Sequence, residues 1–383
     1  MMTDKTQVVN TLNSIADFLE GKETAKKTKV ALTTIGSELG TDELVQGAMM
    51  AVKDNPLLDV VLIGAKPNVD CPLEQHITEC EKEAHKILEE LLVKKEVSGA
   101  VTLHYNFPLG ISTVGRVITP ARGKSMFIAT TTGTTSANRV EAMVLNGILG
   151  IIAAKGAGIN NPKLGVLNVE GSRQVERILT TLKEKGMEFS LAESIRSDGG
   201  SVMRGNDLLS GSCDVMVCDT LTGNILMKIF SSFTTGGNYE TLGWGYGPGI
   251  GKDMKNIISI ISRASGAPVV KGALQYTFEL VQNDLVKVAK EEFSKAEKAG
   301  LSTELEMIKA PIQKEEKVEV PPKKPVTAEI TGIDILQLDD GVGVLWENKI
   351  YAESGMGCAG PVIMVAPEDK EQASGILKEN KYL

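Results

Sequence analysis

Short apolar runs alternate with amphipathic segments through most of the chain. The apolar runs predict strands at residues 29–35, 59–64, 99–104, 125–129, 164–169 and 214–218. Segments with a helical apolar period predict helices at 41–53, with Thr41 as N-cap, and at 73–95, 138–149 and 173–185. Strands that alternate with helices favour a mostly parallel sheet with helices on both faces. We therefore expect an α/β fold.

This alternation stops near both ends and divides the chain into four expected parts. Residues 1–27 read as one amphipathic helix, and 28–297 form the α/β domain. Residues 298–328 are a linker, because the Glu, Lys and Pro that crowd 303–328 cannot bury a core.

The fourth part, residues 329–383, is expected to be a small α+β module. Within it, 334–338 and 342–346 are expected to pair as a hairpin, followed by a glycine-rich turn, a strand at 362–366 and a closing helix. The module is therefore expected to fold around a core of its own.

Composition narrows the function. The 383 residues are 42% hydrophobic, which is enough for a large core. The net charge of −8 repels a phosphate backbone, so we expect no nucleic-acid partner. No run of 18 apolar residues and no apolar signal core occur, which predicts a cytoplasmic protein without a membrane span. Five cysteines in so long a chain predict reduced thiols, one of which could be a nucleophile.

Three strand-to-helix junctions, at 130–136, 170–173 and 219–224, are rich in small and hydroxyl residues. In an open parallel sheet such junctions lie at the carboxyl edge, where backbone N–H groups and positive helix ends suit an anion. Ordinary N-capping explains any one of them, but the three together predict a phosphate-sized site. Its candidate residues are Thr132, Gly133, Thr134, Gly171, Ser172, Thr220, Thr222, Gly223 and Asn224.

Cys358 lies in the stretch Gly-Met-Gly-Cys-Ala-Gly-Pro, at 355–361. Glycines beside a cysteine allow a tight turn that exposes the sulfur and leaves N–H groups free for an oxyanion. Cys358 is therefore the candidate catalytic nucleophile, with a buried structural cysteine as the alternative.

Other sequence features give weaker evidence for a functional site. Cys71, His76, Cys80 and His85 have spacings that resemble a metal site, but His76 and His85 fall on opposite faces of the expected helix, so we predict no metal. His104 is read as a structural histidine rather than a general base. The glycine-rich segment 235–252 does not match a P-loop, and we read it as a mobile loop or lid over the crevice, or else as a plain connection.

Several segments resemble the phosphate:acyl-carrier-protein acyltransferases. These are 35–40 with 44–56, then 161–168, and 213–224, whose sequence Cys-Asp-Val-Met-Val-Cys-Asp-Thr-Leu-Thr-Gly-Asn is the most specific. The resemblance covers residues 28–297 and implies a phosphate acetyltransferase-like fold and acyl phosphate chemistry. This chain departs from the family at Ser37-Glu38 and at 105–110, so we expect a small acetyl group rather than a long acyl chain.

With its charged linker and cysteine-containing tail, the whole chain is similar to the alpha subunits of component C of glycine, sarcosine and betaine reductases. This resemblance implies that a carboxymethyl group on the selenoprotein component A becomes an acetyl thioester on component C. Phosphorolysis then releases acetyl phosphate. The implied partners are component A and the component C beta subunit in a hetero-oligomer, with inorganic phosphate as substrate and no bound cofactor.

Three hypotheses about function remain open from the sequence. In the first, the chain is the acetyl phosphate-forming subunit, and either Cys358 or a cysteine of the beta subunit carries the thioester. The second is a stand-alone phosphate acyltransferase acting on acyl-coenzyme A or acyl-carrier protein. The third is a non-catalytic scaffold that docks the partners through the charged linker.

Overall fold

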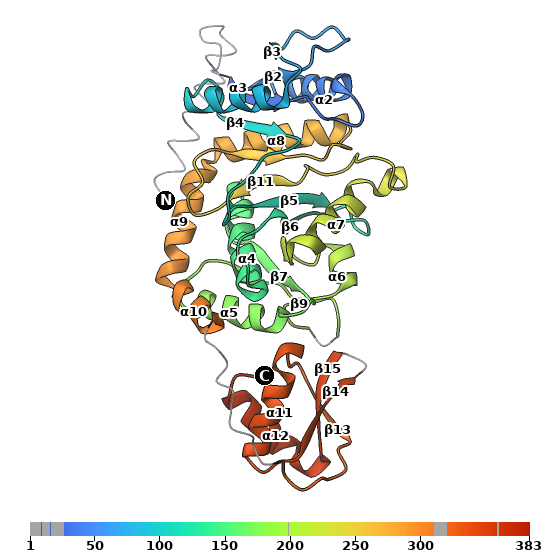
Figure 1. The fold of residues 1–383 in the computed structure, drawn as a ribbon, viewed down its shortest axis with the longest axis vertical. Helices are drawn as coiled ribbons and strands as arrows, with labels where there is room; N and C mark the ends of the chain where they lie inside the picture. Colours follow the sequence, from blue (N-terminus) through green and yellow to red (C-terminus); the bar gives the residue numbers. More distant parts are fainter. Residues whose placement is uncertain (1–8, 10–15, 17–26, 198, 310–319, 358–359) are drawn as a thin grey trace.

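The computed structural model describes residues 9, 16, 27–197, 199–309, 320–357 and 360–383 (Figure 1). The helix expected at 1–27 lies almost wholly outside these residues. Most described residues up to 309 surround one twelve-stranded sheet, and those after 327 surround a three-stranded sheet.

The large sheet has the strand order β3-β2-β1-β4-β12-β11-β5-β6-β10-β7-β8, with β9 also paired to β7. Its strands are β1 (Thr28–Thr33), β2 (Leu58–Gly64), β3 (Glu74–Ile77), β4 (Gly99–Thr102), β5 (Ser112–Ile118), β6 (Ser125–Gly133), β7 (Lys163–Leu167), β8 (Ser190–Leu191), β9 (Val202–Met203), β10 (Val215–Val217), β11 (Gly247–Ile250) and β12 (Ile258–Ile260). The pairs β5–β6, β5–β11 and β11–β12 are antiparallel, and the other pairs are parallel. The predicted α/β class with a mostly parallel sheet is confirmed.

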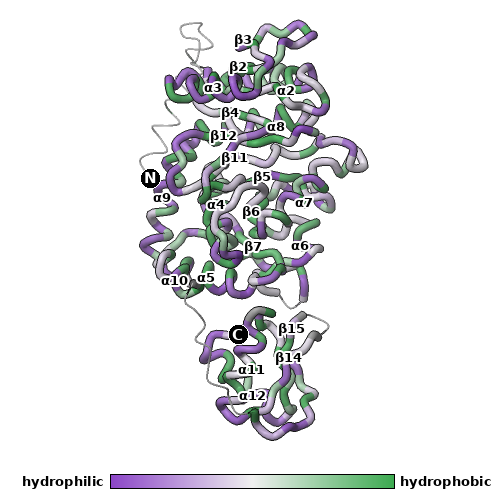
Figure 2. The backbone as a smooth tube through the Cα atoms, in the orientation of Figure 1, coloured by the Kyte–Doolittle hydropathy of each residue, from purple (hydrophilic) through white to green (hydrophobic). Residues whose placement is uncertain are grey.

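Helices cover the sheet. They are α2 (Thr41–Asp54), α3 (Glu81–Val93), α4 (Arg139–Gly156), α5 (Ser172–Glu184), α6 (Gly205–Ser210), α7 (Thr220–Ser231), α8 (Ala267–Gln282), α9 (Leu285–Lys298) and α10 (Leu301–Lys309). Helix α4 is apolar on nearly every side, as its colouring in Figure 2 indicates. Such a helix must be enclosed, and α4 packs between the β6–β10 strands and helices α5 and α9.

The C-terminal module has strand order β13-β15-β14, from β13 (Ala328–Thr331), β14 (Ala352–Gly357) and β15 (Gly360–Val365), and these strands are antiparallel. Helices α11 (Leu338–Glu347) and α12 (Lys370–Glu379) pack against this sheet around a core of the module's own. The closing helix and the strand near 362–366 are therefore confirmed.

The hairpin expected from 334–338 and 342–346 is wrong. Residues 335–337 form a short 3-10 helix, and α11 follows. Leu338, Val342 and Leu345 are all buried, and their spacing places them on one helical face. The hairpin of the module is instead β14 with β15.

Three further expectations are corrected in the large domain. Residues 74–77 of the expected helix 73–95 form β3, an edge strand paired to β2. Gly40, not Thr41, is the N-cap of α2, and it makes no side-chain cap. Residues 301–309 of the expected linker are the helix α10, because Leu305 and Ile308 pack against the main core.

The glycine-rich segment is not a mobile lid along its whole length. Its residues 247–250 are strand β11, buried in the sheet between β12 and β5. At Gly247 the backbone has φ +83°, and a Cβ atom would lie 1.7 Å from the Val114 carbonyl oxygen. Glycine is therefore required here for close backbone packing.

Candidate functional site

The three predicted junctions lie side by side. Strand β10 pairs in parallel with β6 on one side and with β7 on the other, so the carboxyl ends of all three strands reach one edge. Thr130 of β6 meets the start of α7, the helix that follows β10: the Thr130 hydroxyl lies 3.0 Å from the Thr220 hydroxyl. The prediction that the three junctions share a sheet edge is confirmed.

One arginine connects the junctions. Arg139 begins α4, and its guanidinium donates to Asp219 Oδ2 at 3.1 Å and lies 3.8 Å from Glu170 Oε2. Helix α4 starts where the Asn138 side chain accepts a hydrogen bond from the Glu141 N–H. This cap fixes the start of the helix, so Arg139 is held between the second and third junctions.

The first junction differs from the loop expected there. Strand β6 continues to Gly133, so Thr130, Thr131 and Thr132 are strand residues. The Thr113 hydroxyl lies 2.7 Å from that of Thr131 and 2.8 Å from that of Thr132. Thr132 is thus engaged inside the sheet, whereas the candidates Gly133 and Thr134 are exposed at its end.

The third junction, at the N-terminus of α7, is closed by its own carboxylate. Asp219 is the N-cap, and it accepts from the Thr222 N–H at 3.1 Å and from the Thr222 hydroxyl at 2.7 Å. Both donors of Thr222 are therefore already satisfied. The Asn224 amide donates to the Thr131 carbonyl oxygen at 3.0 Å, so this side chain ties α7 to β6.

Gly223 has a packing role. It is buried, and a Cβ atom built on it would lie 1.9 Å from the Thr130 carbonyl oxygen. The missing side chain makes room for the backbone of β6. The sequence correctly marked a position where backbone comes close, and its expected contact with phosphate stays a prediction.

The second junction, at the N-terminus of α5, has the opposite character. Its N-cap is Gly171, no side chain caps the helix, and the first turn contains no acidic residue. Gly171 and Ser172 are both buried. The Ser172 hydroxyl lies 3.4 Å from Asn168 Oδ1. The positive end of this helix is therefore not neutralised by a residue of its own first turn.

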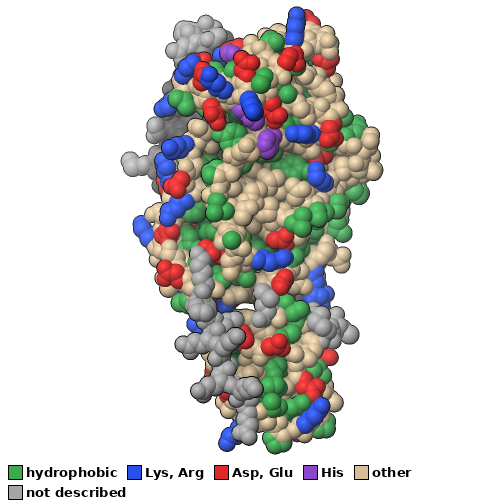
Figure 3. Space-filling model, viewed as in Figure 1, with side chains coloured by type: hydrophobic (Ala, Val, Ile, Leu, Met, Phe, Trp, Pro, Cys, Tyr) green, Lys and Arg blue, Asp and Glu red, His purple; other side chains and the backbone are tan. Residues whose placement is uncertain are grey.

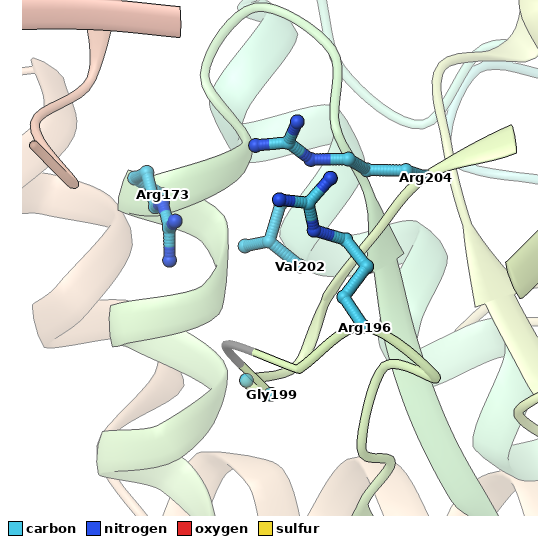
Figure 4. Close-up of a pocket in the computed structure, with 6 residues that line it drawn as sticks. Arg173, Arg196, Gly199, Val202 and Arg204 are labelled. Atoms are coloured by element: carbon cyan, nitrogen blue, oxygen red, sulfur yellow. The ribbon is translucent and has the colours of Figure 1, made fainter. Parts of the chain in front are cut away.

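A pocket beside this helix end is lined by three arginines, Arg173, Arg196 and Arg204, together with Gly199, Gly200 and Val202 (Figure 4). Arg173 comes from the first turn of α5, where its guanidinium also donates to Glu176 at 3.1 Å. Arg196 follows β8, and Arg204 immediately precedes α6. Planar guanidinium groups are suited to bidentate binding of phosphate or carboxylate. Local sequence does not mark Arg196 or Arg204 as site residues.

Buried Asp207 fixes the loop that carries two of these arginines. Its carboxylate accepts from the Ile195 and Arg204 N–H groups at 2.8 and 2.9 Å, and from the Ser194 and Ser212 hydroxyls at 2.8 and 3.1 Å. Burial on its own raises the pKa of Asp207, but these hydrogen bonds outweigh it, so the pKa is lowered from its usual value. A carboxylate that is ionised at neutral pH thus holds the arginine pocket in shape.

The described cysteines offer no activated thiol at this edge. Cys213 and Cys218 are free and buried, and burial raises the pKa of both thiols far above the usual range. Cys358, the candidate nucleophile, lies outside the described residues, between β14 and β15. Over the residues that the structure covers, no group of three or more His, Cys, Asp or Glu side chains could hold a metal ion.

The fold defines an α/β protein with three strand-to-helix junctions and a pocket of three arginines at one edge of its sheet. A family model described as fatty acid synthesis protein matches residues 28–364, and the chain belongs to this family. None of the helices described here is both long and apolar enough to cross a membrane.

Individual relatives are more informative than the family model. The chain is 53% identical over 382 residues to the glycine/sarcosine/betaine reductase complex component C subunit alpha of Peptoclostridium acidaminophilum, with 99% of each chain covered. It is 27% identical over 245 residues to the phosphate acyltransferase of Crocosphaera subtropica, covering 53% of this chain and 68% of the other. The similarity to both groups, expected from the sequence, is confirmed.

Among solved structures, a branched-chain phosphotransacylase from Enterococcus faecalis V583 is similar, with a TM-score of 0.47 and 17% sequence identity. The match covers 66% of this chain and 99% of that one.

Proposed function

We propose that this chain transfers an acetyl group from a thioester to inorganic phosphate, as one subunit of a glycine, sarcosine or betaine reductase complex. The relative that is 53% identical over 99% of the chain is, by its name, a subunit of such a complex. Phosphate acyltransferases are relatives over the large domain. Both groups support acyl transfer as the reaction class.

The observation that carries the proposal is the meeting of three strand-to-helix junctions at one basic edge. The first turn of α5 contains no acidic residue, and Arg173 extends from it. Arg139 lies between this junction and that of α7. Phosphate is a substrate here, and this concentration of positive charge would attract it and offset the charge of the attacking dianion.

The step itself is a thioester phosphorolysis. A phosphate oxygen attacks the thioester carbonyl carbon, a C–O bond forms, and the carbonyl oxygen becomes an oxyanion. The oxyanion then collapses to a carbonyl, the C–S bond breaks, and the sulfur leaves as a thiolate, which takes up, through solvent, the proton that hydrogen phosphate loses. Helix-end N–H groups would stabilise the oxyanion, at about 3–4 kcal/mol for each well-placed donor. The products are acetyl phosphate and a free thiol.

The acetyl group of the thioester must be supplied by the other components of the complex. In this proposal the carboxymethyl group arrives on the selenoprotein component A, and the acetyl group is carried by Cys358 or by a cysteine of the beta subunit. The choice among glycine, sarcosine and betaine is then made upstream of this chain.

The test is acetyl phosphate formation in the reconstituted complex, measured with and without Cys358→Ala. We expect this substitution to abolish formation while phosphate binding remains. Cys80→Ala is the matched control, because Cys80 is an exposed thiol in the large domain, before α3. Full activity of the Cys358→Ala complex would move the acetyl carrier to the beta subunit. No acetyl phosphate from the wild-type complex, with acetyl thioester and phosphate both present, would overturn the proposal.

A second candidate is a stand-alone phosphate acyltransferase, which the relatives over the large domain favour. It predicts acyl phosphate formation by this chain alone from acyl-coenzyme A or acyl-carrier protein. Activity only with the partner subunit would exclude it.

A further inference from the structure

One polar side chain interrupts the apolar interior of α4. Residues 142–154 are all apolar or glycine except Asn146, which is fully buried. Charged side chains, by contrast, are spread over the surface that Figure 3 shows. An amide buried in apolar surroundings costs free energy unless its donors and acceptor are paired, so Asn146 must have specific partners.

Both ends of the Asn146 amide have such a partner. Its Nδ2 donates to the Cys218 carbonyl oxygen at 2.9 Å, and its Oδ1 accepts from the Thr135 hydroxyl at 3.0 Å. A carbonyl oxygen only accepts, so the bond to Cys218 fixes which end of the amide is the NH₂ group. Asn146 therefore bridges two segments that are far apart in the sequence, and we call this set of two hydrogen bonds the Asn146 bridge.

One side of the Asn146 bridge holds the first junction. Thr135 directly follows Gly133 and Thr134, the two phosphate-binding candidates that are exposed at the end of β6. The Thr134 carbonyl oxygen accepts from the Gly110 N–H at 3.0 Å. The exposed end of the first junction is therefore held by this backbone bond and, one residue later, by Asn146.

The other side of the bridge holds the third junction. Cys218 follows β10, and its N–H donates to the Ala129 carbonyl oxygen of β6 at 2.8 Å. The next residue, Asp219, is the N-cap of α7 and accepts from the Arg139 guanidinium at 3.1 Å. A shift of the Cys218 carbonyl group would therefore move Asp219, and with it Arg139.

The same sheet edge is held by an amide from each face. Ala129 of β6 packs in the core that contains α4, whereas its neighbour Ile128 packs in the core beneath α7, so the two helices lie on opposite sides of β6 (Figure 1). From the α7 side, the Asn224 amide donates to the Thr131 carbonyl oxygen. Asn146 is its counterpart on the α4 side, and it is the one that connects the ends of β6 and β10.

We infer that Asn146 is a positioning residue of the phosphate site, which holds the first and third junctions at the separation that phosphate binding requires. Asn146 is fully buried, so it acts through Thr135 and Cys218 and not by touching phosphate. Groups that bind a ligand must be held to within about 0.5 Å by hydrogen bonds behind them. The inference rests on the proposed function, because it takes this edge of the sheet as the phosphate site.

The experiment is titration calorimetry of the full chain with inorganic phosphate, at a temperature where thermal unfolding shows each variant to be folded. Asn146→Leu has a similar volume but leaves the Cys218 carbonyl group without its donor, so we expect the Kd to rise about 10-fold. Asn283→Leu is the matched control. The Asn283 amide donates to the Gly156 carbonyl oxygen at 2.8 Å, which is the same kind of bond at the other end of α4, and its loss should leave the Kd unchanged.

Thr135 tests the Asn146 bridge from its other end. Thr135→Val keeps the shape of the side chain but removes the hydroxyl, and we expect the Kd to rise about 3-fold. Thr135→Ser keeps the hydroxyl and should keep the wild-type Kd, a pattern that a role in stability alone does not predict. Adding Thr135→Val to Asn146→Leu should raise the Kd no further, because both changes break the same bridge.

The possible outcomes are distinguishable. If the wild-type chain binds no phosphate, the proposed function fails and this inference falls with it. If the wild type binds phosphate and folded Asn146→Leu keeps its Kd, the role of Asn146 is wrong while the proposed function stands. Equal losses of affinity in Asn146→Leu and Asn283→Leu would also overturn this role. If Asn146→Leu does not fold, Thr135→Val and Thr135→Ser decide the question, and an unchanged Kd in Thr135→Val counts against the bridge.

Discussion

The N-termini of α5 and α7 lie at the same edge of the sheet, yet they differ in charge. At α7 the Asp219 carboxylate caps the helix and satisfies both donors of Thr222. At α5 the cap is Gly171, the first turn has no acidic residue, and Arg173 points into a pocket with two further arginines. One helix end is therefore capped directly by a carboxylate, whereas at the other end the adjacent carboxylate, that of Glu170, precedes the cap and lies 3.8 Å from Arg139.

The difference shows that a junction rich in hydroxyl residues is not by itself an anion site. A donor binds a ligand only when the protein has not already used it, and a carboxylate at a helix N-terminus offsets the helix dipole that would attract phosphate. By this criterion the α5 end is the stronger attractor. The α7 end, with Gly223 and Asn224 packed on β6, is mainly a structural joint.

The largest expected effect tests whether the α7 end is such a joint. Gly223→Val should destabilise the fold by about 3 kcal/mol or more, because its Cβ atom would overlap the Thr130 carbonyl group. Thermal unfolding measures the loss. Gly375→Ala is the control, since a Cβ atom there meets nothing within 4 Å. A Gly223→Val protein with wild-type stability would contradict the packing role and return Gly223 to the ligand site.

The next effect concerns the support of the arginine pocket. Asp207→Asn should cost about 2 kcal/mol at neutral pH, because in either orientation the amide NH₂ group faces a backbone N–H, that of Ile195 or of Arg204. Urea unfolding of both proteins measures this cost.

The same pair of proteins gives a pH dependence. The folded pKa of Asp207 is lowered, so its carboxylate stabilises the fold above the unfolded pKa of about 3.9, and this contribution is lost as the pH falls through the folded value. The difference between wild type and Asp207→Asn should therefore be constant near neutral pH and shrink below about pH 4. A constant difference down to pH 3 would rule out this linkage.

The third effect is on binding at the α5 end. Arg173→Gln should lower the affinity for inorganic phosphate about 10-fold, because a charge-assisted hydrogen bond contributes about 1.5–3 kcal/mol. Calorimetry measures this affinity. Lys183→Gln removes the same charge near the other end of α5 and should leave affinity unchanged. Equal affinity in both variants would mean that phosphate does not bind at this helix end.

Much of this arrangement follows from local sequence. Apolar runs of strand length between helical periods were sufficient to predict the α/β class, because burial of parallel strands on both faces requires such runs. Parallel direction then places the ends of β6, β10 and β7 at one edge, and the Thr130–Thr220 contact confirms this. The capping role of Asn138 is equally local.

The arginine pocket could not be found in this way. Arg196 and Arg204 reach Arg173 because β8 and β9 both pair with β7, which is a long-range choice that leaves no periodic signal in the intervening loop. The tail helix α11 was missed for another reason. Its two glycines and two valines favour a hairpin locally, but burial of Leu338, Val342 and Leu345 on one face decides for a helix.

The smallest expected effect, that of removing the Asp219 charge, tests the contrast between the N-termini of α5 and α7 directly. Asp219→Asn keeps an oxygen that can accept from the Thr222 N–H, so α7 remains capped, but it removes the negative charge. If that charge is what closes the α7 end, phosphate should bind a few-fold more tightly, since one charge at a helix N-terminus contributes about 0.3–1 kcal/mol. Arg139, which donates to Asp219 Oδ2, would also keep more of its charge for a ligand.

Calorimetry on Asp219→Asn, and on the double variant with Arg173→Gln, measures the change in phosphate affinity. A gain that appears in both backgrounds places the new affinity at α7, whereas a gain that disappears with Arg173 means that both helix ends act on one bound phosphate. Weaker binding in Asp219→Asn would mean that the carboxylate positions Arg139 for the ligand, and the contrast between the two helix ends would have to be abandoned.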